Sequence, residues 1–383
     1  MSDAIDLTVE GLVDEARKRT GLSDFGGEDF RPRLSALLAF YDARLSPRGK
    51  KSERRRLLGL LENRLRIAEA FRRHPGIRAR AIHKPLFLTG LPRTGTSALF
   101  NLLGADPACR PLLLWEGNHP DPLEGLAPGQ EDPRLVALRN ALEKARQMNP
   151  GFAKIHDAQA DKPEECVQLL AHSMGFVQLG VEPVLEPYRT YFASEDRGPI
   201  YAEYADLLRL LDWQRPGERW LLKTPAHLWA LDHLLAHFPD AGIVVTHRNP
   251  LECVPSYCSM VQALMMQYEP VAPEELGPAV LDYLARSVDH AMALRERLPP
   301  DRFVDVRYTD FLADPLGVAR RVHDAFGLPF DGAAKQAMEA HVAANPQNKH
   351  GRHDYGLAEF GLTRERVLDR LSAYVTRYGI ESP

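Results

Sequence analysis

The stretch Pro85-Leu-Phe-Leu-Thr-Gly-Leu-Pro-Arg-Thr-Gly-Thr-Ser97 decides the fold expected for this 383-residue chain. Its first five residues are a short apolar run between Pro and Gly, which predicts a buried strand, and residues 97–103 favour a helix. Gly90, Gly95 and Ser97 match the phosphate-loop pattern G-x-x-x-x-G-K-[ST], but Thr96 stands where the lysine belongs. A strand, a glycine loop and a helix in this order predict an anion-binding loop.

The missing lysine decides which anion the loop can bind. A nucleoside triphosphatase also needs an acidic residue at the end of a neighbouring apolar strand, to hold Mg²⁺. The neighbouring candidate strand, 243–246, is followed by His247 and Arg248, with no carboxylate. The sequence therefore favours a compact anion other than a triphosphate, with Arg93 as the cation inside the loop.

Further apolar runs extend the strand pattern. Residues 220–222 and 243–246 are short and apolar, and a helical pattern over 225–238 separates them. A last alternating run covers 303–308. A strand–helix–strand order predicts parallel strands with right-handed crossovers. We expect an α/β fold, a phosphate-loop-like parallel sheet flanked by helices.

The chain divides by composition into an N-terminal helical extension, 1–80, and an α/β domain, 81–383. Within the second part, residues 110–215 are Pro-rich, then helical and aromatic. Open α/β sheets bind ligands at the carboxyl ends of their strands, so this insertion is expected to form a mostly helical cap over that edge. A final helix is expected over 363–378.

The N-terminal extension carries a basic helix over residues 50–73. Its apolar residues recur at helical spacing, and Ser52 is the expected N-cap. The simplest interpretation is a solvated helix face packed on the main domain. A site for a membrane surface or a polyanion stays open as the alternative.

Composition excludes several classes of partner. The formal net charge of −4 gives no general basic field for nucleic acid. Four scattered cysteines predict a reduced, cytoplasmic chain. The N-terminus lacks the apolar segment of a signal peptide, and no apolar run has the length of a transmembrane segment.

A second polar cluster follows the 243–246 strand. Arg248 stands at the strand end, Asn249-Pro250 predicts a helix start, and Ser256 follows on that helix. An arginine and a hydroxyl so placed can bind a second anion. With the glycine loop, they predict a nucleoside ligand with two anionic ends, held about one nucleotide length apart. 3′-Phosphoadenosine 5′-phosphosulfate has this shape.

Five motifs in order resemble those of the cytosolic and carbohydrate sulfotransferases, over roughly residues 83–378. They look like that family's 5′-phosphosulfate loop, Lys-Thr-Pro segment, 3′-phosphate motif, late strand and C-terminal loop. In the same order they read LTGLPRTGTSALF, LLKTPAHL, VVTHRNPLECVPSY, VRYTDFLADP and NKHGRHDYGLAEFGL.

The resemblance implies which residues bind the nucleotide. The glycine loop would hold the 5′ end, the second cluster the 3′-phosphate, and the C-terminal segment would cover that phosphate. Ala98 stands where some members have an adenine-stacking Trp, so the adenine must stack elsewhere. The implied binding residues are Arg93, Thr94, Gly95, Thr96, Ser97, Arg248, Ser256, Lys349, Gly351 and Arg352.

The reaction implied is sulfuryl transfer from 3′-phosphoadenosine 5′-phosphosulfate to an acceptor hydroxyl on a small molecule, lipid or glycan, releasing adenosine 3′,5′-bisphosphate. Charge grows on the bridging and sulfuryl oxygens, so fixed cations there lower the barrier. Arg93 and Lys223 are the predicted cations, and no metal is required.

A general base must take the proton of the acceptor hydroxyl. His227, four positions after Lys223, is the first candidate, because several family members carry a catalytic His nearby. His156 in the insertion is the second, with Glu164 or Glu165 behind it.

Two other functions stay open. A phosphate-loop kinase or nucleotide triphosphatase would depend on ATP and Mg²⁺, and the missing lysine and carboxylate speak against it. A sulfotransferase-like protein that binds 3′-phosphoadenosine nucleotides without turnover would look the same in sequence.

Overall fold

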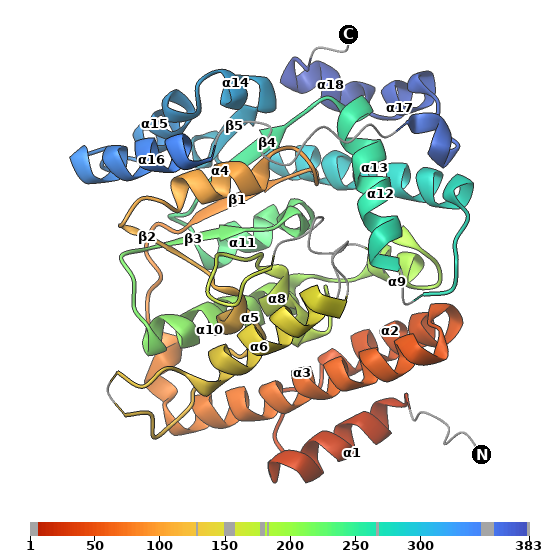
Figure 1. Ribbon diagram of the computed structural model, residues 1–383, viewed down its shortest axis with the longest axis vertical. Helices are drawn as coiled ribbons and strands as arrows, with labels where there is room; N and C mark the ends of the chain where they lie inside the picture. The colour runs from red at the N-terminus through yellow and green to blue at the C-terminus, as the bar shows by residue number, and fades with distance from the viewer. Residues whose placement is uncertain are drawn as a thin grey trace. The chain divides into compact units, whose positions relative to one another are not determined.

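A computed structural model describes residues 7–127, 129–148, 158–176, 181, 184–265, 268–345 and 356–380. Its contacts group the chain into two compact units, a helical unit and a sheet unit (Figure 1). The predicted position of residues 110–215 over the sheet edge stays a prediction. The helical unit comprises Met1–Ala81, Leu113–Pro216 and Ala263–Pro270, and the sheet unit Ile82–Leu112, Gly217–Gln262 and Val271–Pro383.

The sheet unit contains a parallel sheet in the order β2-β3-β1-β4-β5, five strands among the described residues. The predicted α/β class and the parallel sheet are confirmed. The strand of the glycine loop is central, so its carboxyl end is flanked by those of two neighbours. β2 was not predicted, because a three-residue strand containing Arg and Pro gives no apolar run. The strands are β1 (Leu86–Gly90), β2 (Cys109–Pro111), β3 (Arg219–Lys223), β4 (Gly242–His247) and β5 (Phe303–Arg307).

Alternating side chains of β1 build the two faces of the sheet. Leu86 and Leu88 belong to a core that contains apolar residues of α4 (Thr96–Leu103), α15 (Pro315–Ala325) and α16 (Gly332–Ala344). Phe87, from the other face, packs its ring against those of His227 and Phe238. Figure 1 shows α4 beside β1, with α15 and α16 next to it.

Two helices expected to be continuous are divided. The 225–238 pattern forms a 3₁₀ turn and a helix, because Ala230 leaves the helical region with φ −155°. The expected last helix over 363–378 breaks at Leu371, where ψ rises to 17°. The remaining helical elements of the sheet unit are η4 (Pro225–Trp229), α11 (Leu231–His237), α12 (Pro250–Leu264, whose last two residues belong to the helical unit), α13 (Pro273–Arg295), η6 (Pro300–Arg302), α14 (Tyr308–Ala313), η7 (Leu357–Phe360), α17 (Arg364–Arg370) and α18 (Ser372–Tyr378).

The helical unit is built around the long basic helix, α3. Its N-cap is Ser46, six residues before the predicted Ser52: Pro47 takes the first helical position, and Ser46 Oγ accepts a hydrogen bond from Gly49 N–H at 3.2 Å. No helix among the described residues is long and apolar enough to span a bilayer. The elements are α1 (Val9–Thr20), α2 (Phe30–Arg44), α3 (Pro47–Arg73), η1 (Pro75–Ala79), α5 (Leu114–Asn118), α6 (Pro133–Met148), α8 (Val167–Leu170), η2 (Ala171–Ser173), α9 (Tyr188–Ser194) and α10 (Gly198–Gln214).

Candidate functional site

Two glycines fix the shape of the loop between β1 and α4. Gly90 has φ 145°, and a Cβ there would lie 2.5 Å from the carbonyl oxygen of Thr246. Gly95 has φ 89°, and a Cβ there would lie 2.6 Å from Cδ2 of Tyr308. Both the backbone conformation and the close neighbours exclude larger residues. The loop therefore depends on the two glycines that the sequence singled out.

The hydroxyl groups of the loop divide into structural and exposed ones. Thr94 is buried, and its Oγ1 lies 2.6 Å from both Leu91 O and Thr246 Oγ1. Thr96 is also buried, whereas Ser97 is exposed in the first turn of α4. Thr94 therefore braces the loop with its side chain, and Ser97 offers a hydroxyl at the helix N-terminus, where anions are favoured.

Arg93 joins the two predicted clusters. It is exposed, with φ 68°, and its Nε donates a hydrogen bond to Ser256 Oγ at 3.1 Å. Arg248 Nη1 donates to the carbonyl oxygen of Arg93 at 3.0 Å. The Arg93 side chain therefore reaches from the glycine loop to Ser256. That the two clusters hold the two ends of one nucleotide stays a prediction.

Arg248 extends from the end of β4 and already has partners. Its Nε donates to Oε2 of Glu252 at 2.8 Å, an ion pair between the strand end and the first turn of α12. Asn249 Oδ1 accepts from Leu251 N–H at 2.9 Å, which confirms the predicted helix start. The guanidinium lies over the Tyr308 ring, 4.3 Å from its centroid. An anion binding to Arg248 would share this cation with Glu252.

A buried histidine and an ion pair at the surface anchor the strand end that carries Arg248. His247 Nε2 lies 2.8 Å from Asp305 Oδ1, and Arg295 donates to both oxygens of Asp305, at 2.7 and 2.9 Å. The His247 ring stacks on Tyr378 at 3.8 Å. Burial lowers the pKa of His247 although Asp305 opposes the shift, so the neutral ring donates to Asp305 at pH 7. These contacts hold the end of β4 in place and so orient Arg248, the next residue.

Lys223 approaches the loop from the other side of β1. It ends β3, opposite Leu88, and is buried, with only 5% of its surface exposed. Its Nζ donates to Ser97 Oγ at 3.2 Å and lies 5.7 Å from the centroid of the Phe100 ring. Lys223 and Arg93 therefore place two positive charges at the glycine loop and the start of α4.

His227 lies on η4, directly after the Lys-Thr-Pro segment. Thr224 caps this turn by accepting from Ala226 N–H at 3.4 Å, and Thr89 Oγ1 donates to Thr224 O at 3.0 Å. The His227 ring is buried, with its edge toward Phe87 at a centroid distance of 5.3 Å. Burial lowers its pKa to about 3, so the ring is neutral at pH 7.

Several predicted residues stay predictions. Glu164 and Glu165 lie in the helical unit, where Glu164 is buried and accepts from the Glu165 N–H at 2.8 Å. The remaining predicted residues, outside the described ranges, are His156, Lys349, Gly351 and Arg352.

Tyr308 is a residue of the site that sequence reasoning did not assign. Its ring lies against Gly95 and beneath Arg248, so it contacts both clusters. It follows β5, which is parallel to β4, and parallel strands bring their carboxyl ends to one edge. The motif Val306-Arg-Tyr-Thr-Asp310, read with that rule, could have placed an aromatic ring here.

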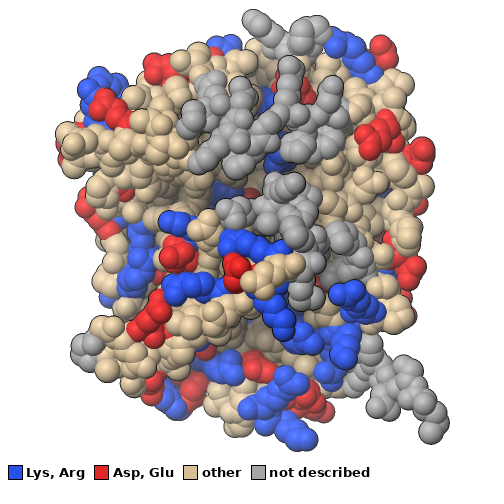
Figure 2. All heavy atoms as spheres, viewed as in Figure 1, with Lys and Arg blue, Asp and Glu red and all other residues tan. Residues whose placement is uncertain are grey.

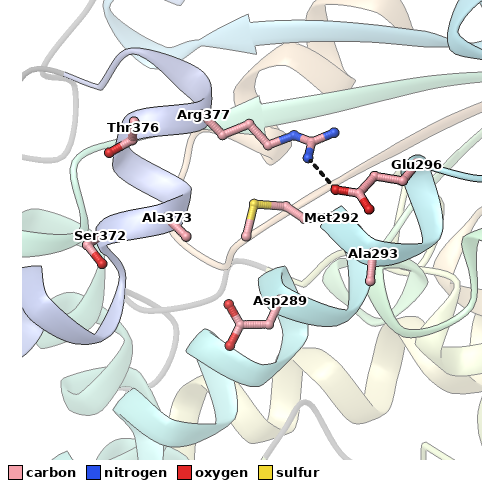
Figure 3. A pocket seen from close by; sticks show the side chains of 8 residues that line it. All are labelled: Asp289, Met292, Ala293, Glu296, Ser372, Ala373, Thr376 and Arg377. Carbon is pink, nitrogen blue, oxygen red and sulfur yellow. Dashed lines mark hydrogen bonds and ion pairs between the residues drawn. The ribbon is translucent and has the colours of Figure 1, made fainter.

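A surface groove between α13 and α18 is separate from these residues (Figure 3). Its volume is about 630 Å³, and none of the predicted site residues lines it. Arg377 points across the groove to Glu296, at 3.3 Å. Asp289, which also lines it, pairs with Arg370 outside the lining at 2.8 Å. The charged side chains that line the groove are therefore paired, and they form no cluster of cations that could bind a phosphate.

Metal ligands do not gather in the described part of the chain. No group of three His, Cys, Asp or Glu residues there could hold a metal ion. The i, i+4 pair His233 and His237 on α11 lies in this searched part.

The charged groups described at the glycine loop are Arg93, Lys223, Arg248 and Glu252.

The fold and the cation-lined glycine loop define a transferase of the sulfotransferase family. Residues 85–332 match the model of that family, and the chain belongs to it. This match covers the sheet strands, the loop and the residues from Arg93 to Tyr308.

Individual sulfotransferases resemble the chain over most of its length. The crystal structure of STF1 from Mycobacterium tuberculosis is 34% identical, covers 96% of this chain and 98% of its own, and has a TM-score of 0.84. STF9 from Mycobacterium avium is 26% identical, with 100% and 99% covered and a TM-score of 0.89. The omega-hydroxy-beta-dihydromenaquinone-9 sulfotransferase Stf3 of Mycobacterium tuberculosis is 27% identical over 325 residues, 78% of this chain and 75% of Stf3.

Proposed function

We propose that the chain transfers a sulfuryl group from 3′-phosphoadenosine 5′-phosphosulfate to the hydroxyl of a lipid-like acceptor. The observation that carries the proposal is the convergence of Arg93 and Lys223 on one glycine loop. A neighbouring strand end adds Arg248, in contact with the same loop. Membership of the sulfotransferase family supports the proposal that these cations bind the sulfuryl donor.

The residues present fit such a donor. Exposed Arg93 and Ser97, with the N-terminus of α4, are suited to the 5′-phosphosulfate, and Arg248 with Ser256 to the 3′-phosphate. The Tyr308 ring supplies an aromatic face between the two clusters. The donor would supply the sulfuryl group itself.

In the proposed mechanism, Lys223 and Arg93 stabilise the negative charge that grows as the sulfuryl group leaves. Lys223 is buried, and a cation in a water-excluded site acts more strongly on nearby charge than one in water. Arginine stays protonated, so Arg93 acts as an electrostatic clamp. The Ser97 hydroxyl, which accepts from Lys223, keeps the ammonium directed at the loop.

The base in the proposal is His227. Its neutral ring, four residues after Lys223, is in the protonation state that a base requires. A pKa of about 3 makes the ring a weak base, so its contribution is expected to be modest. His156, Glu164 and Glu165 remain the alternatives.

The proposed acceptor class follows from a relative. Stf3 is named for a menaquinone derivative, a lipid-like molecule with a terminal hydroxyl. Its 325 matched residues cover 78% of this chain, which supports a hydroxyl-bearing lipid over a glycan.

The proposal is tested by incubating the chain with ³⁵S-labelled donor and a lipid extract, and then identifying the labelled product. Arg93→Ala is expected to lower turnover by about 10²- to 10³-fold, while adenosine 3′,5′-bisphosphate binding changes less. Label on a lipid hydroxyl supports the proposal. Nucleotide binding with no labelled product in any extract would favour the non-catalytic alternative, and ATP–Mg²⁺ turnover the kinase alternative.

A further inference from the structure

The N-terminal half of α3 carries a charge opposite to that of the whole chain. Residues 47–56 include six basic residues and one acidic residue, whereas the complete chain has a formal charge of −4. The acidic residue, Glu53, is buried and paired with Arg56 at 3.1 Å. In Figure 2, Lys and Arg side chains gather at the lower right, over the region of α2 and α3. The excess positive charge is therefore local and directed outward.

Three of these cations form one exposed face, which we call the basic face. Arg48, Lys51 and Arg55 are exposed, and their spacing of three and four residues places them on one side of the helix. No ion pair is recorded for them within the described ranges, whereas Lys50 pairs with Asp42 at 2.7 Å. The basic face thus presents three positive charges directly to solvent.

Helix stability does not explain the basic face. The N-terminus of a helix carries partial positive charge and is stabilised by acidic residues, not basic ones. The first turn of α3 contains no acidic residue, and Arg48 stands at its second position. A different side of α3 packs against the rest of the protein: Leu57, Leu61 and Leu65 there are fully buried. Arg48 therefore opposes the local helix field, and the three exposed cations lie away from the buried leucines that pack α3.

We infer that the basic face binds the surface of an anionic phospholipid bilayer. Clusters of exposed Lys and Arg are attracted to the negative surface potential of such a bilayer. The inference rests on the proposed lipid acceptor, because a lipid partitions into the bilayer and an enzyme bound there meets it directly. An attachment made by surface charge alone is peripheral and reversible.

The expected strength follows from the number of cations. Each Lys or Arg near an anionic surface contributes about a fivefold increase in binding. Removing the three cations should lower binding to anionic vesicles by about 100-fold. Because screening acts over about 8 Å at physiological salt, raising the salt concentration should release the protein.

The test is co-sedimentation of the full chain with vesicles of phosphatidylcholine alone, or of phosphatidylcholine with phosphatidylglycerol. The test variant is R48A/K51A/R55A, in which alanine preserves the helix. The matched control, R297A/R321A/R366A, removes the same charge from exposed positions of the sheet unit. We expect wild type and control to bind the anionic vesicles, and the test variant to lose binding with an unchanged melting temperature.

Three outcomes would overturn the inference: no salt-sensitive vesicle binding by wild type, equal binding to both kinds of vesicle, or equal losses in test variant and control. Tighter binding to heparin than to anionic vesicles would assign the basic face to a polyanion instead. Neither donor nor acceptor is present in the assay, so its result is separate from the sulfuryl-transfer test. Activity with a detergent-dispersed acceptor should be the same in the test variant and in wild type.

Discussion

The two strand ends beside β1 differ in burial. At the end of β3, Lys223 and His227 are buried, and His227 is neutral. At the end of β4, Arg248 has 26% of its side chain exposed and pairs with Glu252. Desolvated groups act strongly on charge that develops beside them, whereas exposed cations mainly attract and orient. The β3 end is therefore suited to the chemical step, and the β4 end to holding the nucleotide.

The largest effect is expected from Lys223→Met, which removes the charge of the β3 end and keeps a chain of similar length. Turnover should fall by about 10³-fold, because a preorganised cation in a buried site is lost. Steady-state kinetics, together with calorimetric titration of adenosine 3′,5′-bisphosphate, separates turnover from affinity. Lys335→Met, at an exposed position of α16 paired with Glu339, is the control and should leave both unchanged. A loss confined to nucleotide affinity would assign Lys223 to binding instead.

His227→Gln tests the base at the same strand end. Turnover should fall by about 10²-fold, the low end for general bases, because the His227 pKa of about 3 makes it weak. The wild-type rate should show no loss from His227 protonation as the pH falls from 7 to roughly 5. If His227 only packs against Phe87, turnover per folded molecule will be retained and only the melting temperature will fall.

The same substitution should change how the free energy of unfolding depends on pH. The unfolded chain binds a proton at His227 near pH 6.5, and the folded chain only near pH 3, because burial lowers the pKa. The stability from the neutral ring is therefore present above pH 6.5 and lost as the pH falls toward 3. Chemical denaturation of His227→Gln should show a shallower decrease in unfolding free energy over this range. An unchanged slope would contradict the buried, neutral state.

A smaller and more selective effect is expected at the β4 end. Arg248→Ala should weaken adenosine 3′,5′-bisphosphate by about tenfold and leave adenosine 5′-monophosphate nearly unchanged, because a charged hydrogen bond to the 3′-phosphate is lost. Glu252→Gln should strengthen the bisphosphate by about twofold, since the competing carboxylate is removed. Equal effects on both nucleotides would mean that Arg248 does not contact a 3′-phosphate.

The sequence predicted best what local rules determine. The glycine loop, its flanking strand and helix, and the start of α12 at Asn249-Pro250 follow from short-range backbone rules, and they are confirmed. Ser52 was the wrong cap, because Ser46-Pro47 is a stronger start signal six residues earlier. These signals all depend on residues within one helical turn.

Contacts between segments far apart in the chain could not be predicted from the sequence. The reach of Arg93 to Ser256 and the contact of Tyr308 with Gly95 join residues more than 150 positions apart. The burial of His227 against Phe87 likewise depends on the whole sheet face. Spacing within a motif carries no information on such contacts, so the hydrogen bond that joins the two clusters was not predicted.

The most direct measurement is a calorimetric titration of the wild-type chain with adenosine 3′,5′-bisphosphate, adenosine 5′-monophosphate and ATP–Mg²⁺. Two anion clusters that hold one nucleotide predict that the bisphosphate binds at least about tenfold more tightly than the monophosphate, and more tightly than ATP–Mg²⁺. Equal affinities for the bisphosphate and the monophosphate, or a clear preference for ATP–Mg²⁺, would contradict the assignment of Arg248 and Ser256 to a 3′-phosphate and of the loop to a sulfuryl donor.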